Sequence, residues 1–248
     1  MLNLLTHGDP ALPKLLIAHG LFGSGRNWGV IAKRLADRYH VLAPDLRNHG
    51  DSPWFDSHSY DDLAQDLAAL LDRPTDVVGH SMGGKAAMVL AVTYPDLVNR
   101  LIVADIAPVA YAHSQSHNIA AMRAVDLSGV ARRSEAGDLL QVEEALKPFL
   151  LQSLDADGKR WKLNLDVLDR DMDKIVGFPE LDGQFDGPAL FLSGADSDYL
   201  QPAHRDRIKA LFPAAKFAKI PGAGHWLHAE KPREFEAALR AFLEAPVG

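Results

Sequence analysis

The chain has 248 residues, of which 47% are hydrophobic and 24% are charged, and its formal net charge is −7 at pH 7. These values suit one large α/β domain or a core with an inserted cap, and the negative charge argues against nucleic acid or an anionic membrane as the main partner. The chain has no cysteine, which excludes disulfides, thiolate catalysis and cysteine-based metal sites, and it begins without a signal-peptide pattern; we therefore expect a cytoplasmic protein.

Short apolar runs alternate with amphipathic segments over the first hundred residues. Continuous runs rich in branched side chains are typical of strands that are buried on both faces of a parallel sheet. The runs with this pattern are Leu15–Ala18, Val41–Ala43, Val77–Val78 and Leu101–Ala104. Between the second and third runs, Tyr60, Leu63 and Leu67 recur at helical spacing, and Ser59 with Asp62 is a capping pair for that helix. The alternation predicts an α/β fold with a mostly parallel central sheet and helices on both faces.

A long stretch between two core strands interrupts this alternation. It has helical patterns, with Ser134 as a candidate cap for a helix over Ala136–Leu151, but no clear buried strand. The stretch could be an ordinary run of peripheral helices, but it is longer than a connection requires. An insertion at this place lies over the ends of the strands where open α/β sheets bind ligands. We therefore predict two core segments, residues 1–108 and 186–248, and a helical cap over residues 109–185 that shapes the substrate pocket.

After this stretch the strand and helix pattern resumes. The expected elements are strands at Ala189–Leu192 and Lys216–Ile220 and helices at Ala203–Leu211 and Arg233–Leu243.

The motif Gly79-His80-Ser81-Met82-Gly83 follows an apolar run and precedes a helical segment. A strand, G-x-S-x-G and a helix together form the context of a nucleophile elbow, in which a sharp turn exposes the serine hydroxyl. The helix would begin at Met82, so its free N–H groups would face an oxyanion formed at Ser81. The pattern alone could equally be a tight connection between a strand and a helix.

Two further segments in their expected contexts favour a hydrolase. His19-Gly20-Leu21-Phe22 follows a strand at the place where a serine hydrolase needs a second oxyanion donor, and Gly224-His225-Trp226 supplies a histidine in a glycine-rich turn. Serine first and histidine last is the α/β-hydrolase order. We therefore predict Ser81 as the nucleophile and His225 as the general base. The backbone amides of Leu21 and Met82 are the predicted oxyanion hole, and Phe22 and Trp226 are predicted pocket walls.

Together with Asp45-Leu46-Arg47-Asn48-His49-Gly50-Asp51-Ser52, Lys85 and Asp105-Ile106-Ala107-Pro108-Val109, these motifs resemble the bacterial YbfF-type acyl esterases of the α/β-hydrolase superfamily. The match covers nearly the whole core. The resemblance implies hydrolysis of small-molecule carboxylic esters, and of acyl-CoA thioesters as a further substrate class, by a serine nucleophile without a cofactor or a metal. It specifies neither the acyl chain length nor an oligomeric state.

The acid of the triad has candidates in two turns. Many members of the superfamily place it in a G-x-x-D turn after the penultimate strand, but here Ser197 stands at that step, between Asp196 and Asp198. The subgroup that the chain resembles uses the aspartate after the preceding core strand, which here is Asp105. Parallel strands end at the same edge of a sheet, so a carboxylate there can reach the histidine. We favour Asp105 and keep Asp196 and Asp198 as alternatives. The non-catalytic alternative for Asp105 is a structural role, in which its side chain caps a helix or a turn.

Three other polar residues lie near the predicted site. Lys85 is one helical turn past Ser81 on a helix that should be partly buried, so we expect it to pair with a carboxylate, Asp45 or Asp105. Arg47 and His49 follow a core strand, and we expect them to tie loops together.

Other function classes remain open at this level. Some proteins of this fold bind small ligands without hydrolysing them, and serine-dependent C–C bond hydrolases and cofactor-free haloperoxidases share the fold. A serine at the elbow argues against epoxide hydrolases and haloalkane dehalogenases, which need an aspartate nucleophile there.

Overall fold

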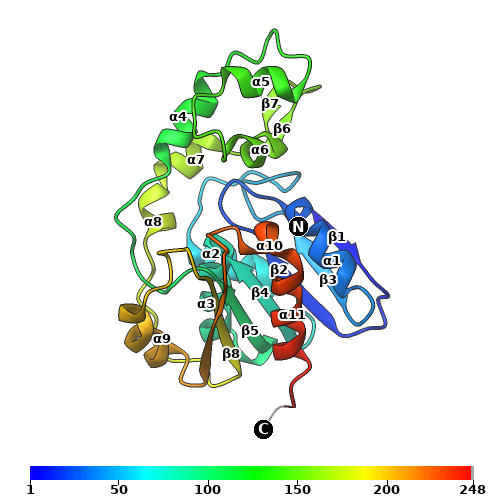
Figure 1. The fold of residues 1–248 in the computed structure, drawn as a ribbon, viewed down its shortest axis with the longest axis vertical. Helices are drawn as coiled ribbons and strands as arrows, with labels where there is room; N and C mark the ends of the chain where they lie inside the picture. The colour runs from blue at the N-terminus through cyan, green and yellow to red at the C-terminus, as the bar shows by residue number, and fades with distance from the viewer. Residues whose placement is uncertain (247–248) are drawn as a thin grey trace.

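A seven-stranded sheet forms the centre of the molecule in the computed structural model, which describes residues 1–246. The strand order is β1-β3-β2-β4-β5-β8-β9 (Figure 1). The strands are β1 (Leu4–His7), β2 (Lys14–Ala18), β3 (His40–Pro44), β4 (Thr75–His80), β5 (Val98–Ala104), β8 (Ala189–Gly194) and β9 (Ala215–Ile220). Strand β1 runs antiparallel to β3, and every other neighbouring pair is parallel. The predicted α/β fold with a mostly parallel sheet is confirmed.

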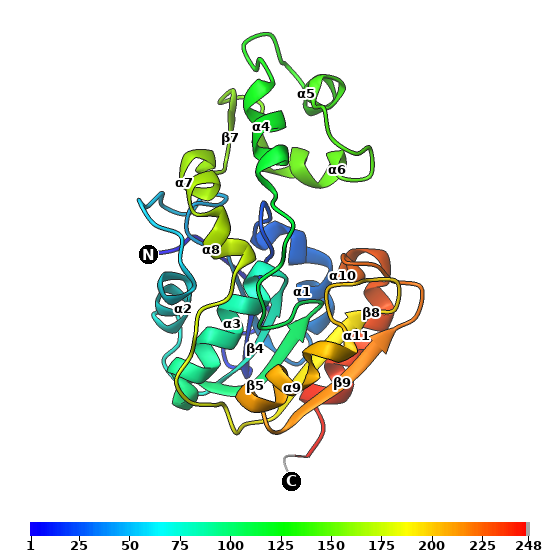
Figure 2. The ribbon, with the colours of Figure 1, turned by 90° about the vertical axis from the view of Figure 1, so that its left-hand side faces the viewer.

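Helices cover both faces of this sheet. In β5, Leu101 and Val103 face one buried cluster whereas Ile102 and Ala104 face the other, as the two-residue period of a strand requires. Helices α2, α3 and α9 pack on the first face, and α1 and α11 pack on the second (Figures 1 and 2). The core helices are α1 (Gly29–Leu35), α2 (Tyr60–Ala68), α3 (Met82–Thr93), α9 (Arg205–Leu211), α10 (Leu227–Glu230) and α11 (Pro232–Leu243). The capping pair of Ser59 and Asp62 begins α2.

A mostly helical cap stands above the sheet between β5 and β8 (Figure 1). Its elements are α4 (Ser116–Ala124), α5 (Arg133–Leu139), α6 (Lys147–Leu150), a short hairpin of β6 (Leu154–Asp155) and β7 (Arg160–Trp161), α7 (Leu165–Arg170) and α8 (Met172–Val176). The side chain of Trp161 is buried, and its Nε1–H donates to the carbonyl of Met122, 2.8 Å away. The buried apolar residues of the cap, Met122 and Trp161 among them, belong to the same cluster as the first face of the sheet. The exact cap limits of 109 and 185 stay a prediction.

The predicted single helix over Ala136–Leu151 is wrong. Helix α5 begins after Arg132, where the Glu135 carboxylate accepts from the backbone N–H of Arg132, and it ends at Leu139. A second helix, α6, has Pro148 in its first turn. Proline has no N–H to donate to the preceding turn, so it fits the start of a helix and breaks a helix that would run through it.

None of the helices within residues 1–246 has the length and apolar character to cross a membrane.

Candidate active site

Ser81 stands in a sharp turn between β4 and α3. Its φ of 54° is in the left-handed region, which few residues other than glycine adopt. A Cβ at Gly79 would lie 2.3 Å from the carbonyl oxygen of Gly83, and a Cβ at Gly83 would lie 2.4 Å from the carbonyl oxygen of Ala18. The two glycines are therefore required because backbone segments touch there, and the turn holds Ser81 at the end of the sheet.

Ser81, His225 and Asp105 form a continuous line of hydrogen bonds. His225 lies in the loop between β9 and α10, and Asp105 directly follows β5. The Nε2 atom of His225 is 3.1 Å from the Ser81 hydroxyl oxygen, and its Nδ1 atom is 2.7 Å from Oδ2 of Asp105. These separations match those of a nucleophile, a base and an orienting acid. The structure thus brings together the three residues that the sequence favoured; their catalytic roles stay a prediction.

The Asp105 carboxylate is completely buried and is held by several donors. Besides His225, it accepts from the backbone N–H of Gly194 at 3.1 Å and from the Ser197 hydroxyl at 2.5 Å. These contacts fix the orientation of the carboxylate toward His225. Asp196 and Asp198 are exposed instead, and neither bonds to His225 in the part of the chain that the structure describes. The sequence analysis recorded Ser197 only as the residue that replaces the aspartate of the G-x-x-D turn. It did not predict that the Ser197 hydroxyl donates to Asp105.

The imidazole of His225 is also fixed by its neighbours. The ring of Tyr199 stacks on it, with the centroids 4.0 Å apart and the planes 21° apart. His80 Nε2–H donates to the backbone carbonyl of His225 at 2.8 Å. Burial lowers the pKa of His80 well below its usual range, so His80 is neutral and serves as a fixed donor. Sequence reasoning did not assign a role to Tyr199 or His80.

The two predicted oxyanion donors border the same space as Ser81. Met82 is the first residue of α3, so its N–H has no acceptor within the helix. Leu21 stands in a turn closed by a hydrogen bond from Gly23 N–H to the Gly20 carbonyl at 3.0 Å. The next residue in that turn, Phe22, has a φ of 64°. Leu21 and Met82 both line the cavity above Ser81, and their role as the oxyanion hole stays a prediction.

A cavity of about 560 Å³ lies between the core and the cap. This volume lies within the range of typical small-molecule sites. The core contributes Ser81, His225, Phe22, Trp226 and Tyr60 to its wall, and the cap contributes His117, Val142, Leu146 and Phe149. The rings of Phe149 and Trp226 face each other across the boundary, with centroids 6.1 Å apart. Both predicted pocket residues, Phe22 and Trp226, thus line this cavity.

The expectation that Lys85 pairs with a carboxylate is wrong. Its ammonium group donates to the backbone carbonyls of Val176 at 2.8 Å and Gly177 at 2.5 Å, where the chain leaves the cap. The group also lies 4.7 Å from the centroid of the Tyr111 ring. Burial lowers the pKa of Lys85 to about 7, whereas the two carbonyls and the ring favour the charged form. Lys85 therefore joins the helix behind Ser81 to the return segment of the cap.

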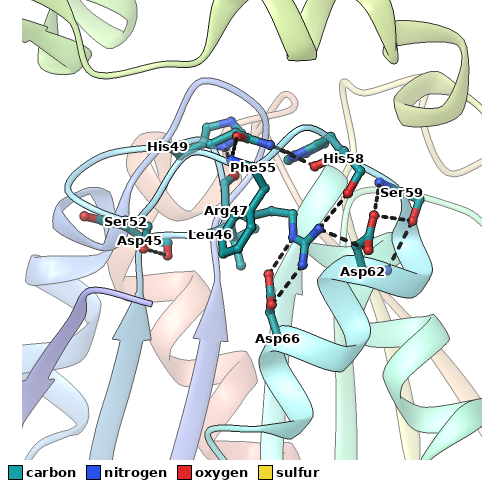
Figure 3. Close-up of polar contacts among 12 residues, drawn as sticks. Asp45, Leu46, Arg47, His49, Ser52, Phe55, His58, Ser59, Asp62 and Asp66 are labelled. Carbon is teal, nitrogen blue, oxygen red and sulfur yellow. Dashed lines mark hydrogen bonds and ion pairs between the residues drawn. The ribbon is translucent and has the colours of Figure 1, made fainter. Parts of the chain in front are cut away.

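Arg47 ties the loop after β3 to α2 (Figure 3). Its guanidinium donates to both carboxylate oxygens of Asp66, at 2.6 and 3.0 Å, and lies 3.1 Å from Asp62. The ring of Phe55 lies 4.7 Å from the same group. This bidentate pair gives Arg47 the structural role that we expected.

Comparison with known proteins agrees with this geometry. The model of the Alpha/beta hydrolase family matches residues 15–238. The chain is 44% identical to the sn-1-specific diacylglycerol lipase ABHD11 of Mus musculus over 96% of this chain and 83% of that protein. It is 40% identical to the esterase YbfF of Escherichia coli strain K12 over 92% of each protein. A solved structure titled "Marine microorganism esterase" superimposes with a TM-score of 0.91 at 39% identity and covers 97% of this chain and 98% of that one.

These matches confirm the resemblance to YbfF-type esterases. Because the family model spans most of the chain and the named relatives are esterases and lipases, the chain belongs to the alpha/beta hydrolase family as an enzyme of the carboxylic ester hydrolase type.

Proposed function

We propose that the chain hydrolyses carboxylic esters through a covalent acyl-enzyme on Ser81. The observation that carries this proposal is the line from the Ser81 hydroxyl through His225 to Asp105, with separations of 3.1 and 2.7 Å. In this arrangement a buried carboxylate fixes the imidazole with its Nε2 lone pair toward the serine.

The reaction proceeds in two halves. As Ser81 Oγ attacks the ester carbonyl, its proton passes to His225 Nε2, and the carbonyl oxygen becomes an oxyanion at the amides of Leu21 and Met82. When the tetrahedral intermediate collapses, His225 gives that proton to the leaving alkoxide. In the second half His225 takes a proton from water, the hydroxide attacks the acyl carbon, and Ser81 leaves with the proton that His225 returns. The carboxylate of Asp105 accepts from His225 Nδ1–H and stabilises the imidazolium formed in each half.

Two observations support a small-molecule ester as the substrate. The cavity above Ser81 is about 560 Å³ and has apolar walls at Phe22, Leu146 and Phe149. The relatives reported above are named as an esterase and as a diacylglycerol lipase. Acyl-CoA thioesters are the second substrate class that we propose, because the same acyl transfer to serine cleaves them. The proposed location is the cytoplasm.

A combined labelling and turnover experiment tests this proposal. The wild-type protein should hydrolyse p-nitrophenyl esters and acyl-CoA thioesters, and a fluorophosphonate probe should label it once. Ser81→Ala should lose both the label and turnover, with kcat lower by about 10⁴-fold or more. Labelling of Ser81→Ala, or cleavage of a diketone by a wild-type protein that leaves esters intact, would contradict the proposal.

A further inference from the structure

The peptide groups that follow Leu21 are held from two sides. The backbone N–H of Phe22 donates to Nε2 of His49 at 3.2 Å, and the Phe22 carbonyl accepts from the hydroxyl of Ser153 at 2.7 Å. Phe22 has a φ of 64° and is almost completely buried. A bulky residue keeps such a backbone conformation only where its surroundings hold it. Ser153 and His49 are therefore placed to maintain the turn that carries the Leu21 amide.

The hydrogen bonds of His49 fix which of its nitrogens accepts. Its Nδ1 atom is 2.9 Å from the carbonyl of Arg47, which can only accept, so the proton is on Nδ1 and the Nε2 lone pair faces Phe22. Burial, with His19 and His58 nearby, lowers the pKa of His49 well below its usual range. The imidazole of His49 is therefore neutral near pH 7 and keeps this acceptor.

A second buried histidine holds the other end of the turn. His19 Nδ1–H donates to the carbonyl of Gly20 at 2.8 Å, while its Nε2 accepts from the backbone N–H of Leu46 at 2.9 Å. The peptide groups before and after Leu21 are thus fixed by separate imidazoles. Their rings pack edge to face, with centroids 5.1 Å apart.

The cap reaches this turn by two routes. Ser153 belongs to the cap itself, directly before β6, and its hydroxyl is buried against Phe22. The loop that carries His49 pairs with the chain that leaves β7, since Gly50 N–H donates to the carbonyl of Lys162 at 2.8 Å. Figure 3 shows His49 at the crest of this loop, on the side toward the cap.

We infer that Ser153 and His49 are positioning residues that hold the Leu21 amide in the geometry of an oxyanion donor, so that docking of the cap completes the oxyanion hole. This inference rests on the proposed function. It predicts a loss in the rate of the chemical step and little loss of substrate binding, because an oxyanion forms only during the reaction.

The test compares Ser153→Ala and His49→Gln with wild type on one p-nitrophenyl ester. Ser153→Ala should lower kcat about tenfold, which is less than the 10²–10³ typical when an oxyanion donor is removed outright, and should change KM less than about twofold. Glutamine can place its amide oxygen near the position of Nε2, so His49→Gln should keep most of the activity, whereas His49→Phe should fall about a hundredfold. Inhibition by a trifluoromethyl ketone, which forms an oxyanion on the serine, should weaken in proportion to kcat/KM.

The matched control is Lys162→Met, which removes the ion pair of Lys162 with Asp51 at 2.7 Å between the cap and the same loop without touching the turn. It should leave kcat and ketone inhibition within about twofold of wild type. If the wild-type protein hydrolyses esters and Ser153→Ala has the same kcat, the inference is wrong but the proposed function still holds. Equal losses in Ser153→Ala and Lys162→Met would also overturn it, because cap docking in general would then be responsible. If His49→Phe fails to fold, Ser153→Ala and the ketone still decide.

Discussion

Three core glycines beside the candidate site, Gly79, Gly83 and Gly194, stand where two backbone segments touch, whereas two glycines of the cap stand against a side chain or in open space. A Cβ at Gly194 would lie 2.2 Å from the carbonyl oxygen of Gly224 beside His225, and Gly83 is equally restricted beside Ser81. In the cap, among residues 1–246, a Cβ at Gly137 would meet only the Leu151 side chain, and a Cβ at Gly129 would meet nothing within 4 Å. The core thus fixes the reacting groups by backbone contact. The cap can change its residues at lower cost and still close the cavity.

The largest expected effect concerns the buried core carboxylate. Asp105→Asn should keep the fold but place an N–H where the carboxylate now accepts, which favours the wrong tautomer of His225 and lowers kcat by about 10⁴-fold. Asp196→Asn and Asp198→Asn should change kcat less than about twofold, since exposed side chains away from such contacts have small effects. Steady-state kinetics of the three variants on one ester decide between them. Normal turnover in Asp105→Asn with collapse in either other variant would move the acid to the later turn.

Matched glycine substitutions in the core and in the cap should lower the free energy of unfolding by different amounts. Gly83→Ala would place a methyl group 2.4 Å from the carbonyl oxygens of Ala18 and His19, so the free energy of unfolding should fall by about 3 kcal/mol or more. Gly129→Ala has open space and should change it by less than about 0.5 kcal/mol. Urea denaturation followed by circular dichroism measures both. Equal losses would show that the cap is as tightly specified as the core.

A smaller effect is expected on substrate specificity when a cap residue that lines the cavity is changed. Phe149→Ala enlarges the cap side of the cavity opposite Trp226, so kcat/KM for longer acyl chains should rise relative to short ones by about tenfold. Leu139→Ala, on an exposed cap residue, is the control and should leave the chain-length profile unchanged. A series of p-nitrophenyl esters from acetate to decanoate provides the profile. A uniform fall across the series in Phe149→Ala would mean that this ring supports the site without selecting the acyl chain.

Sequence patterns predicted the core better than the cap because strands buried on both faces leave continuous apolar runs. Five of the six parallel strands contain such runs, whereas β9 at the edge of the sheet has a mixed pattern with Lys216 and Lys219 exposed. Strand β1 was missed because its residues alternate between exposed and half-buried and resemble a loop. In the cap, α5 ends at Leu139, and Pro148 lies in the first turn of α6, so a pattern of apolar spacing alone joined two separate helices into one. The hairpin of β6 and β7 is too short to leave a periodic signal.

The candidate site was predictable where a motif specifies a turn. Ser81 and His225 follow from glycine-rich turns in the expected order, and Asp105 follows from strand order together with a family resemblance. The partners of Lys85 could not be predicted because they are backbone carbonyls. Every residue has such a carbonyl, so the sequence does not mark which ones accept. The bond from Ser153 to Phe22 joins residues 131 positions apart, and only the docked cap brings them together.

Strands β5 and β8 are neighbours and run in the same direction, so the chain must cross from one end of the sheet to the other between them. Strand β5 is seven residues long, which corresponds to about 23 Å. Residues 177–188, after the last cap helix, can reach ~40 Å when extended. That segment alone is long enough for the crossing. The topology of the sheet is therefore independent of the cap. During evolution the cap could be shortened, exchanged or enlarged without changing how the strands are connected, provided that the new cap still supports the turn at Phe22.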